Sequence, residues 1–244
     1  RLRGHKAVVP FGAQARWLLV SARTAPQQAA RPEQGLSLFV VPADTVGLQR
    51  RGYPTIDGQR AADLSLDVHL PASALLGTAD QAWSLIDTAL AHGLLALCAE
   101  SLGAMQTARD ATIAYLQTRQ QFGVTLARFQ ALQHRAVDMA IAIEQMRSAV
   151  INAASAFGNH QAQPSDATRH ARDQALAAAK VTAGEAGTRV AEEAIQLHGG
   201  IGMTWELPLA HVAKRLVMID HQLGDEDHHL ARYIQLSNGV PLAA

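Results

Sequence analysis

The spacing of apolar residues changes near residue 72, and this change limits the fold more than any other feature of the chain. Before it, short runs rich in valine, leucine and aromatic residues are separated by proline, glycine and polar residues, as in strands joined by turns. After it, apolar residues recur at helical spacing over long segments. We therefore predict a mainly α protein with a partial β-domain over residues 1–72 and a helical domain over residues 73–244.

The first region contains four predicted strands, at residues 6–9, 17–21, 36–41 and 62–70. In the last of these, leucine and valine alternate with Ser65, Asp67 and His69, as in a strand with one buried face. Residues 27–34 are polar and predict a hairpin loop. Four strands are too few to close a barrel, so we expect an incomplete antiparallel sheet.

The second region predicts helices at residues 78 to about 120, 129–159, 166–198, 206–223 and 225–237. Thr78 and Gln81 have the spacing of a capping box at the start of the first helix. Gly199 is expected to end the third helix, and Gly224 to form a hinge between the last two. Long helices joined by short loops pack as an antiparallel four-helix bundle.

Composition narrows the class of protein. The chain has 244 residues with 21 basic and 21 acidic side chains, and this balance argues against nucleic-acid binding. The lone Cys98 cannot form an internal disulfide, which suits a reducing cytoplasm. Residues 85–105 are apolar, but Asp87, His92 and Glu100 interrupt them. We therefore expect a buried central helix there and no membrane span.

Two segments place a polar donor beside glycines at the end of a predicted helix. Residues 119–123 read Arg-Gln-Gln-Phe-Gly, and residues 196–204 read Gln-Leu-His-Gly-Gly-Ile-Gly-Met-Thr. Glycine allows close approach of a ligand to the backbone, and free donors near helix ends suit phosphate oxygens. Either segment alone is an ordinary helix end.

In this order and spacing, the two segments resemble the R-x-x-F-G and Q-x-x-G-G-x-G motifs of the acyl-CoA dehydrogenase family, which acts in fatty acid metabolism. The resemblance covers the whole chain and implies the C-terminal part of such a protein, without its N-terminal helical domain and first strands. It implies FAD as cofactor, and an oligomer in which these segments reach the flavin of a neighbouring subunit. We expect Arg119 of one chain to meet the glycine bend of its mate. The residues that the resemblance assigns to FAD are Arg119, Gln121, Phe122, Gly123, Phe129, Gln130, Gln196, Gly199, Gly200, Asp227 and His229.

The family's catalytic base is a carboxylate that removes the α-proton of an acyl-CoA thioester while hydride leaves to the flavin. In many members it is a glutamate in a Glu-Gly-Thr sequence before a last helix that ends in arginine. Counting back from Arg232 places Asp225 at the base position, with Glu226 as the second candidate. The alternative is structural, since acidic residues after Gly224 also suit the start of a helix.

The tail of the chain is similar to that of pimeloyl-CoA-dehydrogenase-like small subunits, a branch that can work as unequal pairs. The partners implied are therefore an acyl-CoA substrate, an electron-transfer protein acceptor, and a second subunit in a homodimer, a tetramer or a heteromeric pair. Leu94 stands where the family often has an arginine near the acyl pocket. Two alternatives stay open: a flavoenzyme resembling nitroalkane oxidase, in which aspartate is the base, and a catalytically silent subunit.

The segment from Asp220 to His229 is rich in acidic and histidine residues. His228 and His229 are adjacent, so on a helix their side chains point apart instead of converging on one ion. We predict no metal site there.

Overall fold

The computed structural model describes residues 1–26 and 33–238, which form two compact units. The first unit covers residues 1–89, and the second begins at residue 90, inside a long helix. Most of the loop predicted at residues 27–34 lies outside the described residues. Each unit has its own buried cluster of apolar side chains.

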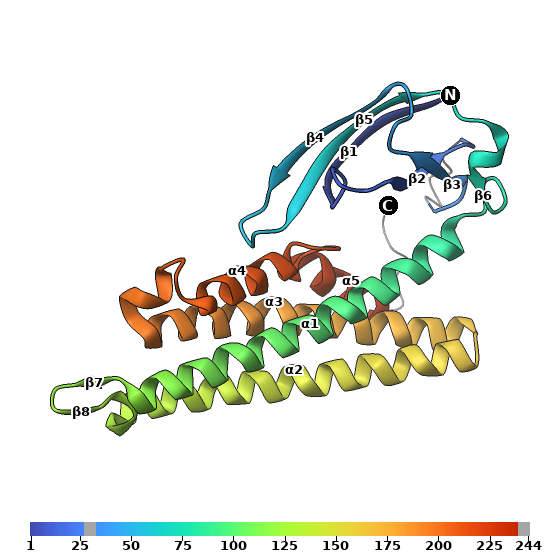
Figure 1. Cartoon of the computed structure of the whole chain (residues 1–244). Helices are drawn as coiled ribbons and strands as arrows, with labels where there is room; N and C mark the ends of the chain where they lie inside the picture. The colour runs from blue at the N-terminus through green and yellow to red at the C-terminus, as the bar shows by residue number, and fades with distance from the viewer. Residues whose placement is uncertain (27–32, 239–244) are drawn as a thin grey trace. The chain divides into compact units, whose positions relative to one another are not determined.

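The first unit contains two antiparallel sheets of three strands each within the described residues (Figure 1). The first sheet has the order β1 (Leu2–Pro10), β5 (Arg60–Val68), β4 (Leu48–Pro54). The second has the order β2 (Trp17–Arg23), β3 (Leu36–Pro42), β6 (Leu75–Leu76), with the 3-10 turn η1 (Ala72–Ala74) before β6. The alternation in β5 is confirmed, because Leu64, Leu66 and Val68 are buried. The sequence did not predict β4, whose residues are mostly polar and exposed at a sheet edge.

Helices dominate the second unit, and the predicted fold class is confirmed (Figure 1). The long helices are α1 (Trp83–Thr118), which begins in the first unit, α2 (Gln130–Ala162) and α3 (Asp166–His198). The short ones are α4 (Pro208–Asp220) and α5 (Glu226–Asn238). Between α1 and α2 lie strands β7 (Gln120–Gln121) and β8 (Val124–Thr125) and the turn η2 (Leu126–Arg128). The 3-10 segment η3 (Gly199–Met203) follows α3.

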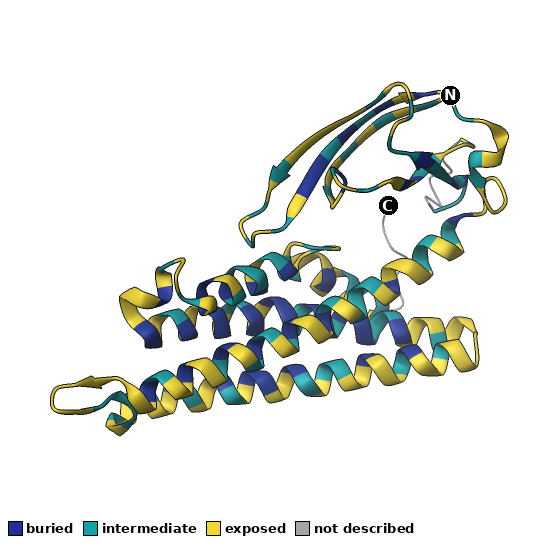
Figure 2. Ribbon diagram, viewed as in Figure 1, coloured by how far each residue is buried: buried dark blue, intermediate teal, exposed yellow. Residues whose placement is uncertain are grey.

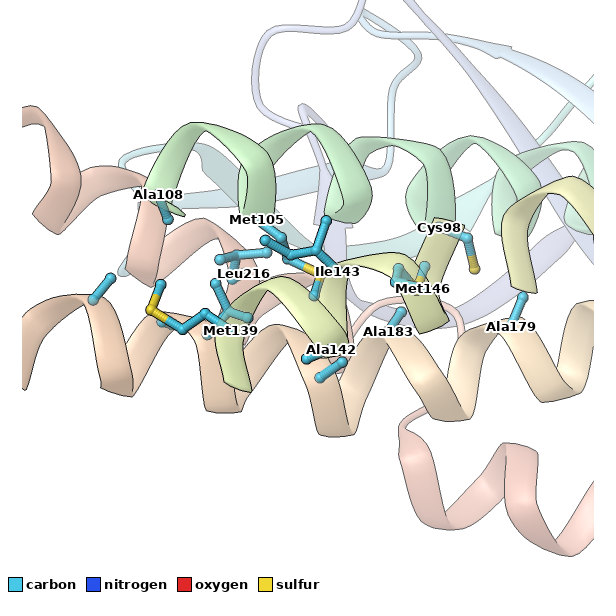
Figure 3. Close-up of a cluster of buried hydrophobic side chains, with 14 of the residues drawn as sticks. Cys98, Met105, Ala108, Met139, Ala142, Ile143, Met146, Ala179, Ala183 and Leu216 are labelled. Atoms are coloured by element: carbon cyan, nitrogen blue, oxygen red, sulfur yellow. The ribbon is translucent and has the colours of Figure 1, made fainter. Parts of the chain in front are cut away.

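The bundle core is built on α3, the helix with the most buried residues (Figure 3). Small side chains such as Ala179 and Ala183 face larger ones such as Met146 and Leu216, so that the helix backbones approach closely. Cys98 lies in the same cluster, and burial raises the pKa of its thiol to about 12. The thiol is therefore protonated at neutral pH and behaves as a small apolar side chain.

The prediction that α1 is a buried central helix is right for only one stripe. Cys98, Met105 and Leu116 pack into the bundle core, while exposed residues alternate with them along the helix (Figure 2). By length and composition alone, α1 is apolar enough to cross a membrane. Its buried stripe is that of a helix on the outside of a bundle.

Two helix ends were predicted from the local sequence, and one of them is confirmed. Gly199 ends α3 with φ +68°, as predicted, and the structure adds a capping box between Ser165 and Thr168 at the start of this helix. The capping box predicted at Thr78 is wrong, because α1 begins at Trp83. The carboxylate of Asp80 instead accepts a hydrogen bond from Thr24, and its N–H donates to Ser37, so this segment extends the first unit.

Candidate cofactor and active site

A tight hairpin follows α1 and presents the first of the two glycine-containing segments. The N–H of Arg119 donates to the carbonyl of Tyr115, and its carbonyl accepts from the N–H of Leu126, both at 2.8 Å. Phe122 and Gly123 form the turn between β7 and β8, with φ of +54° and +80°. A two-residue hairpin of this kind needs positive φ at both positions, which explains the glycine.

The side chains of this hairpin point outward. Within residues 1–26 and 33–238, the guanidinium of Arg119 has no hydrogen-bond or ion-pair partner, and the residue is exposed. Phe122 is 90% exposed, and its ring meets Phe129 edge-on at 6.0 Å between centroids. In the described part of the chain, Gln121 donates to the carbonyl of Gln120 alone. Gln130 lies exposed at the start of α2. The hairpin thus exposes hydrogen-bond donors and an aromatic ring to solvent.

The second glycine-containing segment lies at the C-terminal end of α3. Gly202 has no room for a side chain, since a Cβ would lie 2.9 Å from the carbonyl oxygen of Ile195. Gly199 has φ +68°, which favours glycine. Gly200 has neither constraint, and a Cβ there would meet nothing within 4 Å. The chain's own packing therefore does not require Gly200, whereas a ligand lying on the backbone would.

These two segments lie at the same end of one chain's bundle (Figure 1). The imidazole of His198, the last residue of α3, stacks on Tyr115 of α1 with centroids 4.5 Å apart, and its Nδ1 donates to the carbonyl of Ala194. The sequence predicted that Arg119 meets the glycine bend of a second chain. Within one chain, α1 and α3 run in the same direction, so both segments also lie at the same end of a single bundle (Figure 1). The sequence assigned His198 no role.

The turn between α4 and α5 carries the two candidate bases. Asp225 is exposed, and its carboxylate accepts a hydrogen bond from the N–H of His228 at 2.9 Å. This hydrogen bond is the main cause that lowers the pKa of the Asp225 carboxyl. Asp225 is therefore the N-cap of α5, which is the structural alternative recognised from the sequence.

Glu226 has a different environment. Its N–H donates to the Asp220 carboxylate at 3.1 Å, which fixes the start of α5. Burial raises the pKa of the Glu226 carboxyl, and the nearby Glu185, Asp220 and Asp227 raise it further. Among the described residues, no side chain or N–H bonds to this carboxylate. Glu226 therefore holds a proton more readily than Asp225 does.

His229 lies inside the bundle, whereas Asp227 is exposed in the first turn of α5. The Nε2 of His229 donates to the carbonyl of Leu223 at 2.9 Å, and its Nδ1 is buried without a hydrogen-bond partner in the described residues. Burial lowers the pKa of His229 to about 4, and the nearby Lys180 adds to this effect. The imidazole is thus neutral and braces the turn, a role different from the flavin contact implied by the resemblance.

The turn also packs against α1, one residue before the position where the family often has an arginine. A Cβ on Gly93 would lie 2.9 Å from Cδ1 of Leu223, so the helix and the turn are in close contact. The next residue, Leu94, is partly buried against the bundle core. The surface where α1 contacts the turn is therefore apolar.

Two further side chains connect the turn and α5 to α3, and only one of them was identified from the sequence. Arg232, which set the alignment of the last helix, donates to the Asp173 carboxylate at 3.1 Å. Lys180 was not singled out, although it stands alone among the alanines of α3. Its Nζ donates to the carbonyls of Asp220 and Gly224. A charged residue on an apolar helical stripe is the signal that could have revealed it.

Across the described ranges, no group of three or more histidine, cysteine or acidic residues is placed to hold a metal ion. The side chains of His228 and His229 were predicted to point apart, and this is wrong, because their rings meet edge-on with centroids 5.0 Å apart. His229 is already bonded to Leu223.

The chain is similar to known proteins in sequence and fold. The family described as acyl-CoA dehydrogenase, C-terminal domain, matches residues 80–230. A probable acyl-CoA dehydrogenase of Bacillus subtilis, YngJ, is 32% identical over 208 residues, which are 82% of this chain and 51% of that protein. The chain spans about half the length of the curated relatives it matches.

Solved structures share the fold. The acyl-CoA dehydrogenase of Geobacillus kaustophilus superposes with a TM-score of 0.85 at 27% identity, covering 97% of this chain and 60% of that one. The ChsE4–ChsE5 complex of Mycobacterium tuberculosis gives a TM-score of 0.82 at 25% identity, covering 99% of this chain and 60% of that one.

Proposed function

Because this chain belongs to the acyl-CoA dehydrogenase family, a family of flavoproteins, we propose that it is the C-terminal part of an FAD-dependent enzyme that removes hydrogen from the α and β carbons of an acyl-CoA thioester. The observation that carries the proposal is the convergence of Arg119 and the Gly199–Gly200 bend at one end of the bundle. Among the described residues, the Arg119 guanidinium is exposed and has no partner, and a Cβ at Gly200 would meet nothing within 4 Å.

The residues at this end fit the diphosphate of FAD. The unpartnered guanidinium of Arg119 offers charge-assisted hydrogen bonds, which are the strong ones for phosphate oxygens. Gly200 lets the backbone lie against the ligand, and Gln196 and Gln130 add exposed amide groups. When bound, FAD would supply flavin N5 as the acceptor of the hydride from the β carbon. The chain's own task here is to hold the diphosphate.

The proton is removed by a carboxylate of the α4–α5 turn. The sequence placed the base at Asp225, but the carboxylate of this residue caps a helix and its pKa is lowered. Glu226 has a raised pKa and a side chain longer by one methylene group. A general base works best when its pKa approaches the operating pH. We therefore propose that Glu226 removes the α-proton and that Asp225 caps α5.

A second subunit completes the site in this proposal. Phe122 is 90% exposed and the hairpin that carries it extends from the end of the bundle (Figure 1). The ChsE4–ChsE5 relative is a complex of two named chains, which is a precedent for an unequal pair. The electrons leave to an electron-transfer protein, and the intact protein acts in the cytoplasm.

The test uses the intact protein. Purified enzyme is expected to show flavin absorbance, and anaerobic addition of an acyl-CoA is expected to bleach it. A panel of acyl chains then identifies the substrate. Oxygen uptake with nitroalkanes, with no bleaching by any acyl-CoA, would support the oxidase alternative. Bound flavin that no substrate bleaches would support a silent subunit.

A further inference from the structure

Lys180 is an unusual residue for the centre of a helical bundle. Its side chain is fully buried on α3, within the stripe of alanines that packs against the other helices. Burial of an ammonium group is costly unless the charge is paired and hydrogen-bonded. Burial lowers the pKa of Lys180, and the nearby Asp220 opposes this shift. The cost of burying the ammonium group must therefore be offset by the contacts that it makes.

Those contacts fall on the two ends of the turn that carries the base. The Nζ of Lys180 donates to the carbonyl of Asp220, the last residue of α4, at 2.6 Å and to the carbonyl of Gly224 at 2.7 Å. It also lies 3.8 Å from the carboxylate of Asp220. That carboxylate in turn accepts the N–H of Glu226. One buried cation thus links the end of α4 to the start of α5.

The turn needs such a link because its backbone is strained. Leu223 has φ +57°, a conformation that is costly for a residue with a side chain, and Gly224 follows with φ +96°. The carbonyls at the C-terminal end of α4 also carry partial negative charge, which a cation stabilises.

One turn along α3, Gly184 allows the loop to lie against the helix. A Cβ at this position would lie 2.4 Å from the Asp220 carboxylate and 3.1 Å from Cβ of Glu226. Lys180 and Gly184 together form one contact surface for the turn, the first through hydrogen bonds and the second through lack of a side chain.

We propose that Lys180 is a positioning residue that holds the α4–α5 turn and thereby sets the place of the Glu226 carboxylate relative to the substrate. This inference rests on the proposed function of Glu226 as base. A buried cation can often be replaced by an apolar residue without loss of stability. The cation is kept here because it fixes one conformation of the turn.

The first test is Lys180→Met in the intact flavoprotein, which removes the donors and keeps the length. Backbone amides of residues 221–229 are expected to exchange hydrogen about tenfold faster or more, while exchange in α1 to α3 stays as in wild type. The rate of flavin bleaching by acyl-CoA is expected to fall by about tenfold or more at unchanged KM, because misplacement of the base affects the chemical step. Lys214→Met is the matched control, since Lys214 lies on α4 over the Trp205 ring and has no bond to the turn.

Gly184→Ala gives a second variant that does not remove a buried charge. Alanine favours the helix, so folding is expected to be preserved while the turn is pushed outward. Bleaching that is as fast in both folded variants as in wild type would overturn the positioning role. Unchanged amide exchange in residues 221–229 would overturn it as well. A wild-type protein that no acyl-CoA bleaches would contradict the proposed function, and the exchange experiment would still test the link between Lys180 and the turn.

Discussion

We call the end of the bundle that carries Arg119 and the Gly199–Gly200 bend the cofactor end, after the proposed function. Its polar groups are exposed, whereas those of the α4–α5 turn are bonded within the chain. At the cofactor end, Arg119 and Gly200 are exposed, and the Arg119 guanidinium bonds to none of the described residues. At the turn, Lys180, Asp220 and His229 are buried or half-buried and bonded to the chain itself. In the proposed function, the first region binds an external ligand, whereas the contacts of the second hold the chain's own backbone.

This difference explains which region could be read from the sequence. A ligand-binding end requires particular residue types at fixed spacing, and that requirement is visible as a motif. The support of the turn requires one buried cation and one missing side chain on another helix. Neither Lys180 nor Gly184 lies near Glu226 in the sequence. The residues that hold the turn therefore leave no pattern in the sequence of the turn itself, and the one signal of Lys180 lies on α3.

The largest effect is expected at the turn. Glu226→Gln keeps the size of the side chain and removes the base, so flavin bleaching by acyl-CoA is expected to slow by about 10² to 10⁴. Asp225→Asn is the control, because asparagine also caps a helix well and should leave the rate within a few-fold. The reverse ranking of these two variants in stopped-flow traces would return the role of base to Asp225.

The lowered pKa of His229 makes the free energy of unfolding of the protein depend on pH. Its pKa is lowered from 6.5 to about 4 in the folded protein, chiefly by burial, with Lys180, His228 and Arg232 acting in the same direction. The unfolded chain therefore binds a proton more readily, and stability is full above pH 6.5 and is lost as pH falls towards 4. The contribution is about 3 kcal/mol, from the free energy of one pKa unit.

Urea denaturation of the intact protein at several pH values measures this effect. His229→Gln keeps a donor towards Leu223 and removes the titration, so its free energy of unfolding is expected to fall less between pH 6.5 and pH 4.5. Equal slopes for the variant and wild type would mean that His229 is not the group responsible.

At the cofactor end, Arg119→Met is expected to weaken FAD binding by about 10- to 100-fold, the value of a hydrogen bond to a charged group. Stability should change little, since this guanidinium is exposed. Arg128→Met removes a charge from the neighbouring turn η2 and serves as the control. Isothermal titration of the apoprotein with FAD gives both values. Equal losses in the two variants would indicate a general effect of charge, without a specific contact.

The smallest effect is expected at the glycine bend. Gly200→Ala should leave the thermal midpoint unchanged, because a Cβ at this position meets nothing within 4 Å. It should weaken FAD binding several-fold, because the methyl group would occupy space next to the backbone that the ligand is proposed to use. Gly199→Ala has to adopt φ +68° and is expected to destabilise the protein by about 1 kcal/mol. Calorimetry and FAD titration of both variants separate the two roles. Undiminished FAD affinity in Gly200→Ala would remove this residue from the site.

The fold itself shows the same division between local and distant causes. The C-terminal end of α3 was predicted from Gly199, because the residue that ends a helix directly follows it in the sequence. The cap expected at Thr78 was wrong, since contacts of Asp80 with Thr24 and Ser37 override the local pattern. Strand β4 was missed because an exposed edge strand shows no apolar alternation.

The direction of the helices could have been used more fully. Helices that alternate in direction bring the C-terminal ends of the first and third to the same end of a bundle. The sequence therefore contains enough information to place Arg119 and Gly199 at the same end of one chain's bundle. It could not show the Tyr115–His198 stack that joins them, because a tyrosine and a histidine on two helices have many possible neighbours.

The most direct test is the structure of the intact protein with FAD bound. The account predicts that Arg119 and Gly200 of one and the same subunit both contact the diphosphate, with the guanidinium at about 2.7–2.9 Å from a phosphate oxygen. A diphosphate held by Arg119 of one subunit and the glycine bend of another, or one that touches neither, would contradict it.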